Sequence, residues 1–352
     1  MGVKIVGVGS FIPEFVRKNS DFLNHHFYTN QGEIFEDEPD LILKKFEKIT
    51  GIEERRYVED HLTVSDIAVL ASKKAIADAK INPETLDYII FAHNFGDVKS
   101  DSNQTDIVPS LAARVKHQLK IKNPDCRAYD MIFGCPGWVE SCIHAKAFID
   151  AGMAKNCLVI GAETLSRVVD PHDRDSMIYA DGAGATVLSS TDEPGGIMAH
   201  ATQSHTYQES NYIYFERSFN PTIEGNTKYI KMHGRKIYNF ALTHVPQAMK
   251  KCLDESGFEI SQLKKIFIHQ ANEKMDEAIV SRFYQLYNFE KPDGVMPMSI
   301  KNLGNSSVAT IPTLYDLYLR GEFGGNDFEA GDVIMFASVG AGMNINAIIY
   351  QY

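Results

Sequence analysis

The chain has 352 residues, of which 44% are hydrophobic and 23% charged, a composition that excludes a disordered, collagen-like or coiled-coil architecture. Its 35 Lys and Arg residues are outnumbered by 46 Asp and Glu residues, which gives a formal net charge of -11. Because duplex nucleic-acid binders usually carry excess positive charge, we expect no nucleic-acid partner.

No segment is predicted to direct the chain to a membrane or out of the cell. Met1–Ile12 has one Lys and a short apolar run, lacks the layout of a cleavable signal, and predicts a buried strand. Val333–Tyr350 is interrupted by glycines and polar residues, so it predicts a strand, a turn and a second strand instead of a membrane span. The five cysteines form no CxxC pair, which argues against a disulfide framework or structural zinc. We therefore expect a cytoplasmic protein.

The first half of the chain reads as alternating helices and buried strands. His25–Pro39 is acidic and aperiodic, and is interpreted as a surface insertion or lid. Ser65–Lys80 carries apolar residues at helical spacing, and Asp87–Asn94 is a continuous apolar strand pattern that ends in His93. Such unbroken apolar strands are typical of a sheet covered on both faces.

Cys135 follows the next predicted strand. That strand ends near Gly134, and the Cys stands at the mouth of a helix that reaches to about Gly152, with Pro136 in the first turn. A helix N-terminus carries about half a positive charge, which favours thiolate over thiol. The predicted turn also leaves backbone N–H groups beside the sulfur that suit an oxyanion. The alternative is a buried structural cysteine.

The second half repeats the pattern of the first. After a strand at Asn156–Gly161 and an irregular connection at about His200–Asn226, a helix is predicted at Gly234–Ser256 and a strand at Lys264–Asn272 that carries His269. His93 and His269 are separated by half the length of the chain, as are the starts of the strands at Asn156 and Asp332. The sequence therefore predicts two copies of one α/β unit, with an N-terminal half over residues 1–195 and a C-terminal half over residues 196–352.

Three further features of the second half are candidates for chemistry. His269 stands at the carboxyl end of a buried strand, where open α/β sheets place ligand chemistry; the alternative is a satisfied core histidine. Asn305 lies in a Gly-Asn-Ser-Ser turn that opens a helix predicted at Val308–Leu319, which it alternatively only caps. The glycine-rich turn around Ala341 offers backbone N–H groups, or is a plain hairpin turn.

Cofactor motifs are missing from the sequence. Gly7 and Gly9 do not complete a dinucleotide fingerprint, because Ile12 and Pro13 occupy the region where the third glycine would fall. No HExxH, EF-hand or Walker pattern occurs. We therefore expect no nicotinamide cofactor and no metal ion.

Taken together, Cys, His and Asn at strand–turn junctions of a duplicated unit resemble the thiolase-fold condensing enzymes, in particular β-ketoacyl-acyl-carrier-protein synthase III. The resemblance spans nearly the whole chain. The segments that carry it are VGVGSFIP at the start, TGIEERR, the Cys135 segment, DPHDRDS, YADGAGATVL, HQAN, GNSS and the C-terminal glycine turn. It implies an α/β thiolase fold whose two pseudo-repeated halves stack as a layered αβαβα sandwich.

The resemblance also implies a two-step reaction without a cofactor. Cys135 would take an acyl group from acyl-CoA or from an acyl carrier protein (ACP), and malonyl-ACP would then lose carbon dioxide and attack that acyl group. The product would be a β-ketoacyl thioester for fatty acid or related polyketide-like biosynthesis. Neutral His269 and the Asn305 amide match the groups that stabilise the enolate, and the backbone N–H groups of Cys135 and Ala341 match the oxyanion hole.

Other positions match binding residues of the family. Arg174, Gly234, Asn272 and Val108 correspond to positions near the coenzyme A, the pantetheine arm or the acyl group, and Lys274 corresponds to a basic residue that docks the carrier protein. Val108 replaces a bulky aromatic of acetyl-preferring members, which favours a longer or branched acyl group. Two departures concern the donor: the residues that clamp the adenine of coenzyme A fall at Lys45 and Ile49. The family further implies a homodimer in which Val108 reaches the neighbouring site.

Two alternatives remain at this stage. A non-decarboxylative or head-to-head acyl-CoA condensing enzyme of the same fold needs a glutamate base, and the loop from Gly96 to Pro109 holds Asp97, Asp101 and Asp106 but no Glu. A non-catalytic partner subunit typically loses the nucleophile, which this chain keeps.

Overall fold

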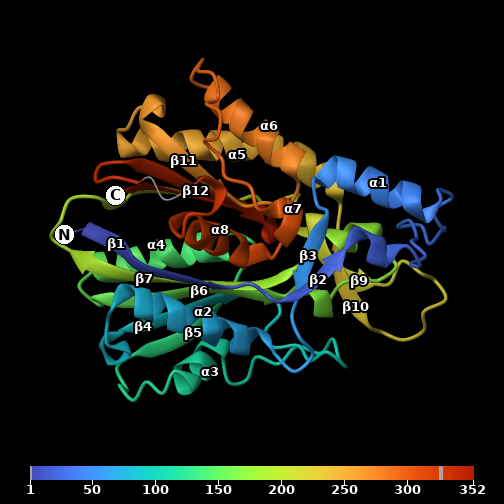
Figure 1. Ribbon diagram of the computed structural model, residues 1–352, viewed down its shortest axis with the longest axis horizontal. Helices are drawn as coiled ribbons and strands as arrows, with labels where there is room; N and C mark the ends of the chain where they lie inside the picture. The colour runs from blue at the N-terminus through green and yellow to red at the C-terminus, as the bar shows by residue number, and fades with distance from the viewer. Residues whose placement is uncertain (1, 325–327) are drawn as a thin grey trace.

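The computed structural model describes residues 2–324 and 328–352; Met1, the first residue of the predicted N-terminal strand, lies outside them. Two sheets form the framework (Figure 1). The first has the order β1 (Gly2–Phe11), β7 (Asp181–Thr191), β6 (Asn156–Thr164), β4 (Tyr88–His93), β5 (Arg127–Ile132). The second has the order β8 (Gly196–Ser204), β13 (Asn344–Gln351), β12 (Val333–Gly340), β11 (Leu263–Ile268).

The two sheets share one pattern of strand directions. In the first sheet β7 runs antiparallel to β1 and β6, and β6 is parallel to β4. In the second sheet β13 runs antiparallel to β8 and β12, and β12 is parallel to β11. The predicted repeat is therefore confirmed at the level of strand order. The sheet changes between β7 and β8, close to the predicted boundary of the two halves.

Helices form three layers around the two sheets (Figure 1). The outer face of the first sheet is covered by α2 (Val64–Ala79) and α3 (Leu111–Gln118). Between the sheets lie α4 (Gly137–Asp150) and α8 (Thr310–Leu319). The second sheet is covered by α5 (Gly234–Ser256) and α6 (Glu273–Gln285). The predicted αβαβα sandwich is confirmed.

The middle layer joins the two halves through apolar packing. Trp138 of α4 is 1% exposed and meets Phe336 of β12 edge-on, with ring centroids 5.3 Å apart. Phe336 in turn packs against Tyr315 of α8. Burying each such side chain stabilises the fold by roughly 1.5–3 kcal/mol. The two halves therefore share one core and hold their facing strand ends in a fixed relation.

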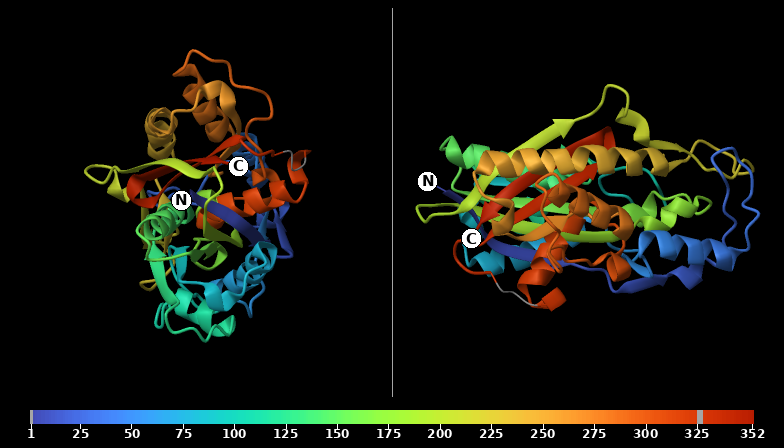
Figure 2. Two further views of the ribbon diagram at one scale, coloured as in Figure 1. Left: turned by 90° about the vertical axis from the view of Figure 1, so that its left-hand side faces the viewer. Right: turned by 90° about the horizontal axis from the view of Figure 1, so that it is seen from above.

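Smaller elements gather at the end of the molecule opposite the termini (Figures 1 and 2). They are α1 (Pro39–Thr50), α7 (Ile300–Leu303), the ribbon of β2 (Phe15–Lys18) with β3 (Glu54–Tyr57), and the ribbon of β9 (Ile213–Arg217) with β10 (Lys228–Met232). The prediction of an irregular connection at His200–Asn226 is wrong in part, because β8 and β9 run into it. In β8 buried and exposed residues alternate, a pattern that its polar residues obscured.

Among residues 2–324 and 328–352, no helix combines the length and apolar character needed to cross a membrane.

Candidate active site

Cys135 lies in the turn between β5 and α4. The Gly137 N–H donates to the Gly134 carbonyl at 2.8 Å, which closes the turn, and α4 begins at Gly137 with Pro136 as the residue before it. The sequence predicts Pro136 in the first turn of this helix. In the structure Pro136 precedes the helix by one residue. The Cys135 side chain is half-buried and lines a cavity, whereas the other four cysteines are buried in the core.

His269 follows β11 directly. Its backbone N–H donates to the Ala337 carbonyl of β12 at 2.8 Å, and the neighbouring Gln270 is anchored to Pro297 and Ser299. The imidazole is 4% exposed, and its Nδ1 has no hydrogen-bond partner within the described part of the chain. Burial lowers the pKa of His269 to about 3, so the ring is neutral at physiological pH.

Asn305 is held by its backbone and by one side of its amide. Its N–H donates to the Ile178 carbonyl at 3.0 Å, and its carbonyl accepts from the Ala180 N–H at 2.8 Å. Its Oδ1 accepts from the Ser307 N–H at 2.7 Å, so the amide NH2 is left as the donor available to the cavity. The helix that it was predicted to cap begins later, as a 3-10 turn at Ser307–Ala309 followed by α8.

These three side chains, from both halves of the chain, meet at one cavity of about 240 Å³. Most of the remaining wall is apolar. It includes Phe95, Leu165, Ile178, Ile213, Phe215, Ile230, Met232, Ile237, Met275, Val339 and Met343. Phe95 and Phe215 are in ring contact, with centroids 5.4 Å apart. The β9–β10 ribbon thus supplies one side of the wall.

The sequence predicts a thiolate at Cys135 because the residue stands at a helix N-terminus, but the charge state in the structure is different. Burial raises the pKa of the Cys135 thiol to about 11, opposed by a hydrogen bond that the Ser307 hydroxyl donates to Sγ at 3.3 Å. The prediction of a thiolate in the free protein is therefore wrong. Desolvation of the anion in this apolar cavity outweighs the field of the helix end. The free protein holds a thiol that is ionised only to a small extent at neutral pH.

Two glycines allow the Cys135 turn and the Ala341 turn to touch. A Cβ on Gly134 would lie 2.6 Å from the Ala341 nitrogen, and a Cβ on Gly340 would lie 2.6 Å from the Cys135 nitrogen. Any larger residue at either position would force the backbones apart. The predicted oxyanion-hole groups, the N–H of Cys135 and the N–H of Ala341, therefore belong to two turns in direct contact.

The predicted pantetheine residues surround two hollows outside this cavity. Gly234 and Arg174 line both hollows, and Asn272 lines one, together with Lys45 and Ile49. Asn272 also caps α6, because its Oδ1 accepts from the Met275 N–H at 3.0 Å. Ile178, Met232, Ile237, Ala271 and Met275 line both the inner cavity and an outer hollow. The two spaces are therefore adjacent.

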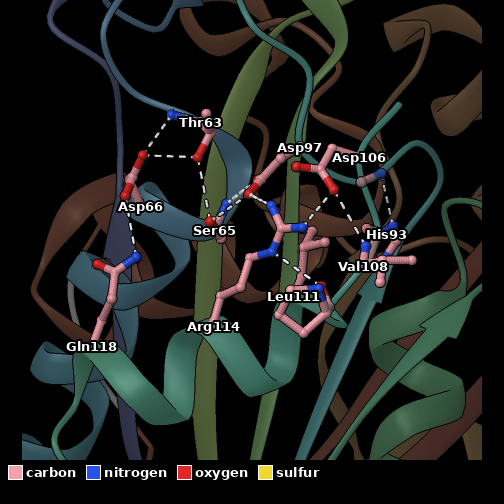
Figure 3. A network of polar contacts seen from close by, with 12 residues as sticks. Thr63, Ser65, Asp66, His93, Asp97, Asp106, Val108, Leu111, Arg114 and Gln118 are labelled. Atoms are coloured by element: carbon pink, nitrogen blue, oxygen red, sulfur yellow. Dashed lines mark hydrogen bonds and ion pairs between the residues drawn. The ribbon is translucent and has the colours of Figure 1, made fainter. Parts of the chain in front are cut away.

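Val108 and Lys274 lie apart from the reactive cavity of their own chain. Val108 is 83% exposed on the loop that follows β4, and Lys274 is exposed in the first turn of α6. Figure 3 shows that Arg114 fixes the Val108 loop, because its guanidinium binds Asp97 at 2.7 Å and Asp106 at 2.6 Å. Asp97 accepts in addition from the backbone and hydroxyl of Ser65.

Three residues that were not predicted from the sequence, Ser307, Asn94 and Glu163, stand behind Cys135. Ser307 Oγ contacts the sulfur, Asn94 Nδ2 donates to Ser307 Oγ at 3.1 Å, and the same amide donates to Glu163 Oε1. One signal was available: Asn94 follows His93 as Gln270 follows His269 in the repeat. Nothing in the sequence pattern pointed to Glu163, which lies inside the strand β6.

Comparisons with known proteins agree with this arrangement. The model of 3-oxoacyl-[acyl-carrier-protein (ACP)] synthase III matches residues 129–206, and the model of its C-terminal part matches residues 253–352. The β-ketoacyl-[acyl-carrier-protein] synthase III of Neisseria gonorrhoeae is 30% identical over 99% of both chains, and that of Aquifex aeolicus is 29% identical over 100% of both.

Solved structures are similar along the whole length. The crystal structure of 3-oxoacyl-[acyl-carrier-protein] synthase III from Aquifex aeolicus matches with a TM-score of 0.80 and 27% identity, covering 100% of both chains. That of the Pseudomonas aeruginosa synthase matches with a TM-score of 0.80 at 23% identity, covering 100% of this chain and 98% of the other, which supports the fold. The chain therefore belongs to the β-ketoacyl-acyl-carrier-protein synthase III family of condensing enzymes.

Proposed function

We propose that this protein catalyses a decarboxylative Claisen condensation between an acyl group carried on Cys135 and malonyl-ACP. The observation that carries the proposal is the convergence of Cys135, His269 and Asn305 on one apolar cavity. The reaction yields a β-ketoacyl thioester, a step of fatty acid or related biosynthesis.

In the first step the Cys135 sulfur attacks an acyl thioester. The new bond joins Sγ to the acyl carbon, the bond from that carbon to the donor sulfur breaks, and the proton of Cys135 leaves with the donor thiol. The N–H groups of Cys135 and Ala341 are suited to the negative oxygen that forms during the attack. Because the resting group is a thiol, proton loss accompanies the attack instead of preceding it.

In the second step a malonyl thioester occupies the same site. Loss of carbon dioxide leaves an enolate, whose oxygen accepts hydrogen bonds from neutral His269 and from the Asn305 amide. Its carbon then attacks the acyl carbon, the bond from that carbon to Sγ breaks, and the released Cys135 sulfur takes up a proton to return to the thiol. A neutral imidazole suits this role, since its N–H stabilises the anion without removing an acidic proton from the product.

The walls of the site favour a hydrocarbon primer and a phosphorylated carrier arm. The apolar cavity suits an acyl chain. Outside it, the outer hollows are lined by the four cations Lys45, Arg174, Arg235 and Lys236 and by the two carboxylates Asp173 and Asp175, so positive charge is in excess there on an otherwise acidic protein. We assign Arg174, Gly234 and Asn272 to the pantetheine arm and Lys274 to contact with the acidic carrier protein.

We further propose a homodimer formed along the edge of the first sheet. Strand β5 is the last strand of that sheet, and Ile132 at its end is 65% exposed. Ile107 and Val108 of the nearby loop add exposed apolar surface. An open edge strand with apolar neighbours is a natural site for pairing with a second copy. Light scattering after size-exclusion chromatography tests this, and a monomer at micromolar concentration would refute it.

The alternative condensing reactions are disfavoured by the same loop. Asp97 and Asp106 are both engaged by Arg114, so neither is available as a carboxylate base (Figure 3). Asp101, the third carboxylate of the loop, is exposed and is not part of the cavity wall. Glu163 is not part of the cavity wall. A non-catalytic partner subunit is disfavoured because all three reactive groups are retained.

Intact-mass spectrometry tests the proposal directly. The protein is incubated with acyl-CoA and acyl-ACP donors of two to ten carbons, straight and branched, and malonyl-ACP is then added. We expect one acyl adduct on the wild type, none on Cys135→Ala, and conversion of the adduct to β-ketoacyl-ACP. An adduct that malonyl-ACP never consumes would refute the condensation, and no adduct with any donor would favour the partner subunit.

A further inference from the structure

The polar chain behind Cys135 has a definite direction. Glu163 is 1% exposed, and its Oε1 accepts from both the backbone N–H and the side-chain amide of Asn94, the former at 2.7 Å. Two donors from one residue on one oxygen fix the Asn94 amide with its nitrogen toward Glu163. The second hydrogen on that nitrogen then points to Ser307 Oγ, at 3.1 Å.

The direction of this chain decides what Ser307 can do. Because Ser307 Oγ already accepts from Asn94, its single hydrogen is free to donate, and the nearest acceptor is Cys135 Sγ at 3.3 Å. If the Asn94 amide were reversed, its oxygen would compete for that hydrogen. The Glu163 carboxyl, at the far end of this series of hydrogen bonds, therefore controls whether the Cys135 sulfur receives a hydrogen bond.

The backbone conformation of Ser307 is unusual and is consistent with a positioning role. Its φ of 53° lies in the left-handed region, which residues with a side chain seldom adopt. The strain is held by the bond from its N–H to Asn305 Oδ1. One residue thus orients two reactive groups, with its N–H on Asn305 and its O–H on Cys135.

We propose that Asn94 is a positioning residue, fixed by Glu163, that directs the Ser307 hydroxyl onto the Cys135 sulfur and so stabilises the negative charge that develops on this sulfur during the attack and that it carries when it leaves. This role concerns the reactivity of the sulfur and applies to any thioester chemistry at Cys135. Other ionisable groups lie near the two ends of this series of hydrogen bonds, that is, near Cys135 and near Glu163. Tyr179 and His269 line the cavity with Cys135, and Glu163 interacts with His93 and Asp181.

Alkylation of Cys135 by iodoacetamide measures this bond without any substrate. The other four cysteines are buried, so intact mass reports one site, with Cys135→Ala as background. Rates are taken from pH 7 to 9.5, where they follow the thiolate fraction. We expect Ser307→Gly, which keeps the left-handed backbone, and Asn94→Ala each to slow alkylation about tenfold, the effect of a pKa raised by about one unit.

The double variant separates positioning from simple damage. If Asn94 acts through Ser307, Asn94→Ala together with Ser307→Gly is no slower than Ser307→Gly alone. Multiplied effects would overturn the proposal, as would an unchanged rate in Asn94→Ala. Ser72→Ala removes a buried hydroxyl of α2 that has no hydrogen-bond partner in residues 2–324 and 328–352, and it should leave the rate unchanged.

Two replacements of Glu163 separate the effect of its hydrogen-bond acceptor from the effect of its negative charge. Glu163→Gln and Glu163→Leu both remove the negative charge, which by itself favours the thiolate, but only Gln keeps an oxygen for the two Asn94 donors. We expect the Leu variant to react several-fold more slowly than the Gln variant. Equal rates in two folded proteins, as judged by circular dichroism and melting temperature, would overturn the part assigned to Glu163.

Discussion

His93 and His269 occupy the same position in the two halves, yet the fold uses them differently. Each stands at the carboxyl end of a strand that pairs in parallel with its neighbour: His93 ends β4, which pairs with β6, and His269 follows β11, which pairs with β12. His93 is fully buried: its Nδ1 accepts from the Gly96 N–H at 3.0 Å, and its Nε2 lies 3.2 Å from Asp130 Oδ2. His269 lines the reactive cavity and keeps Nδ1 without a hydrogen-bond partner among the described residues.

In both halves the carboxyl end of the strand places a histidine where it could take part in chemistry. The segment that follows the strand determines whether that histidine is buried or faces the cavity. After β4 the chain folds back as the loop fixed by Arg114, and the Gly96 N–H of that loop donates to His93 Nδ1 (Figure 3). After β11 the chain enters α6 within a few residues and leaves His269 facing the cavity. A structural histidine and a reactive one thus arise from one repeated unit.

The largest expected effect comes from His269→Ala. Removing one donor from an enolate site costs about 100- to 1,000-fold in kcat, so condensation should fall by that factor. Acylation of Cys135 in a single turnover, followed by intact mass, should persist. Condensation at the wild-type rate would show that His269 does not contact the enolate.

A smaller effect is expected from Gly340→Ala, which tests the contact between the halves. The added Cβ would lie 2.6 Å from the Cys135 nitrogen and must push the Ala341 turn away. A shift of this size costs about ten- to a hundredfold in kcat/KM. Gly182→Ala is the matched control, because its nearest atom would lie 3.6 Å away. Equal activity of the two variants would argue against an oxyanion hole at Ala341.

The two halves also differ at the position of Glu163, whose counterpart in the repeat is the apolar Val339. Only the first half therefore has a titratable group there, and the stability of the protein should depend on pH through it. Burial raises the pKa of Glu163 to about 7 from an ordinary 4.5. Between these values the folded protein keeps a proton that the unfolded chain releases, so stability falls as pH rises. Relative to the wild type, Glu163→Gln should therefore gain up to about 3 kcal/mol between pH 4.5 and 7.

Urea unfolding at pH 5, 6, 7 and 8 measures this difference. Burial also raises the pKa of Asp181 to about 6, but Asp181 titrates in both proteins, so its contribution largely cancels. A stability difference that is the same at all four pH values would contradict the raised pKa of Glu163.

The smallest effect on chemistry is expected from His93→Ala, the structural member of the pair. Loss of its bond to Gly96 and its contact with Asp130 should cost about 1–3 kcal/mol of stability, seen as a lower melting temperature. Its kcat should fall far less than that of His269→Ala. If the two variants lost activity equally, the contrast between the histidines would not hold.

Local patterns in the sequence were enough to predict individual helices and strands. Apolar runs predicted the strands that carry His93 and His269, helical spacing predicted α2 and α5, and the repeat predicted two copies of one α/β unit. The strand order that the two sheets share became visible only in the structure. The sequence also identified Cys135, His269 and Asn305 as candidates, because strand–turn junctions are visible in local composition and the family motifs are local.

The electrostatics of the site, in contrast, follow from the folded arrangement. The field at the mouth of α4 is a local property and predicted a thiolate, but burial raises the pKa of Cys135 to about 11. The separate use of His93 and the link from Glu163 to Ser307 likewise depend on segments distant in the chain. Desolvation and hydrogen-bond direction are set by the residues that pack around a group, and a linear pattern does not contain that information.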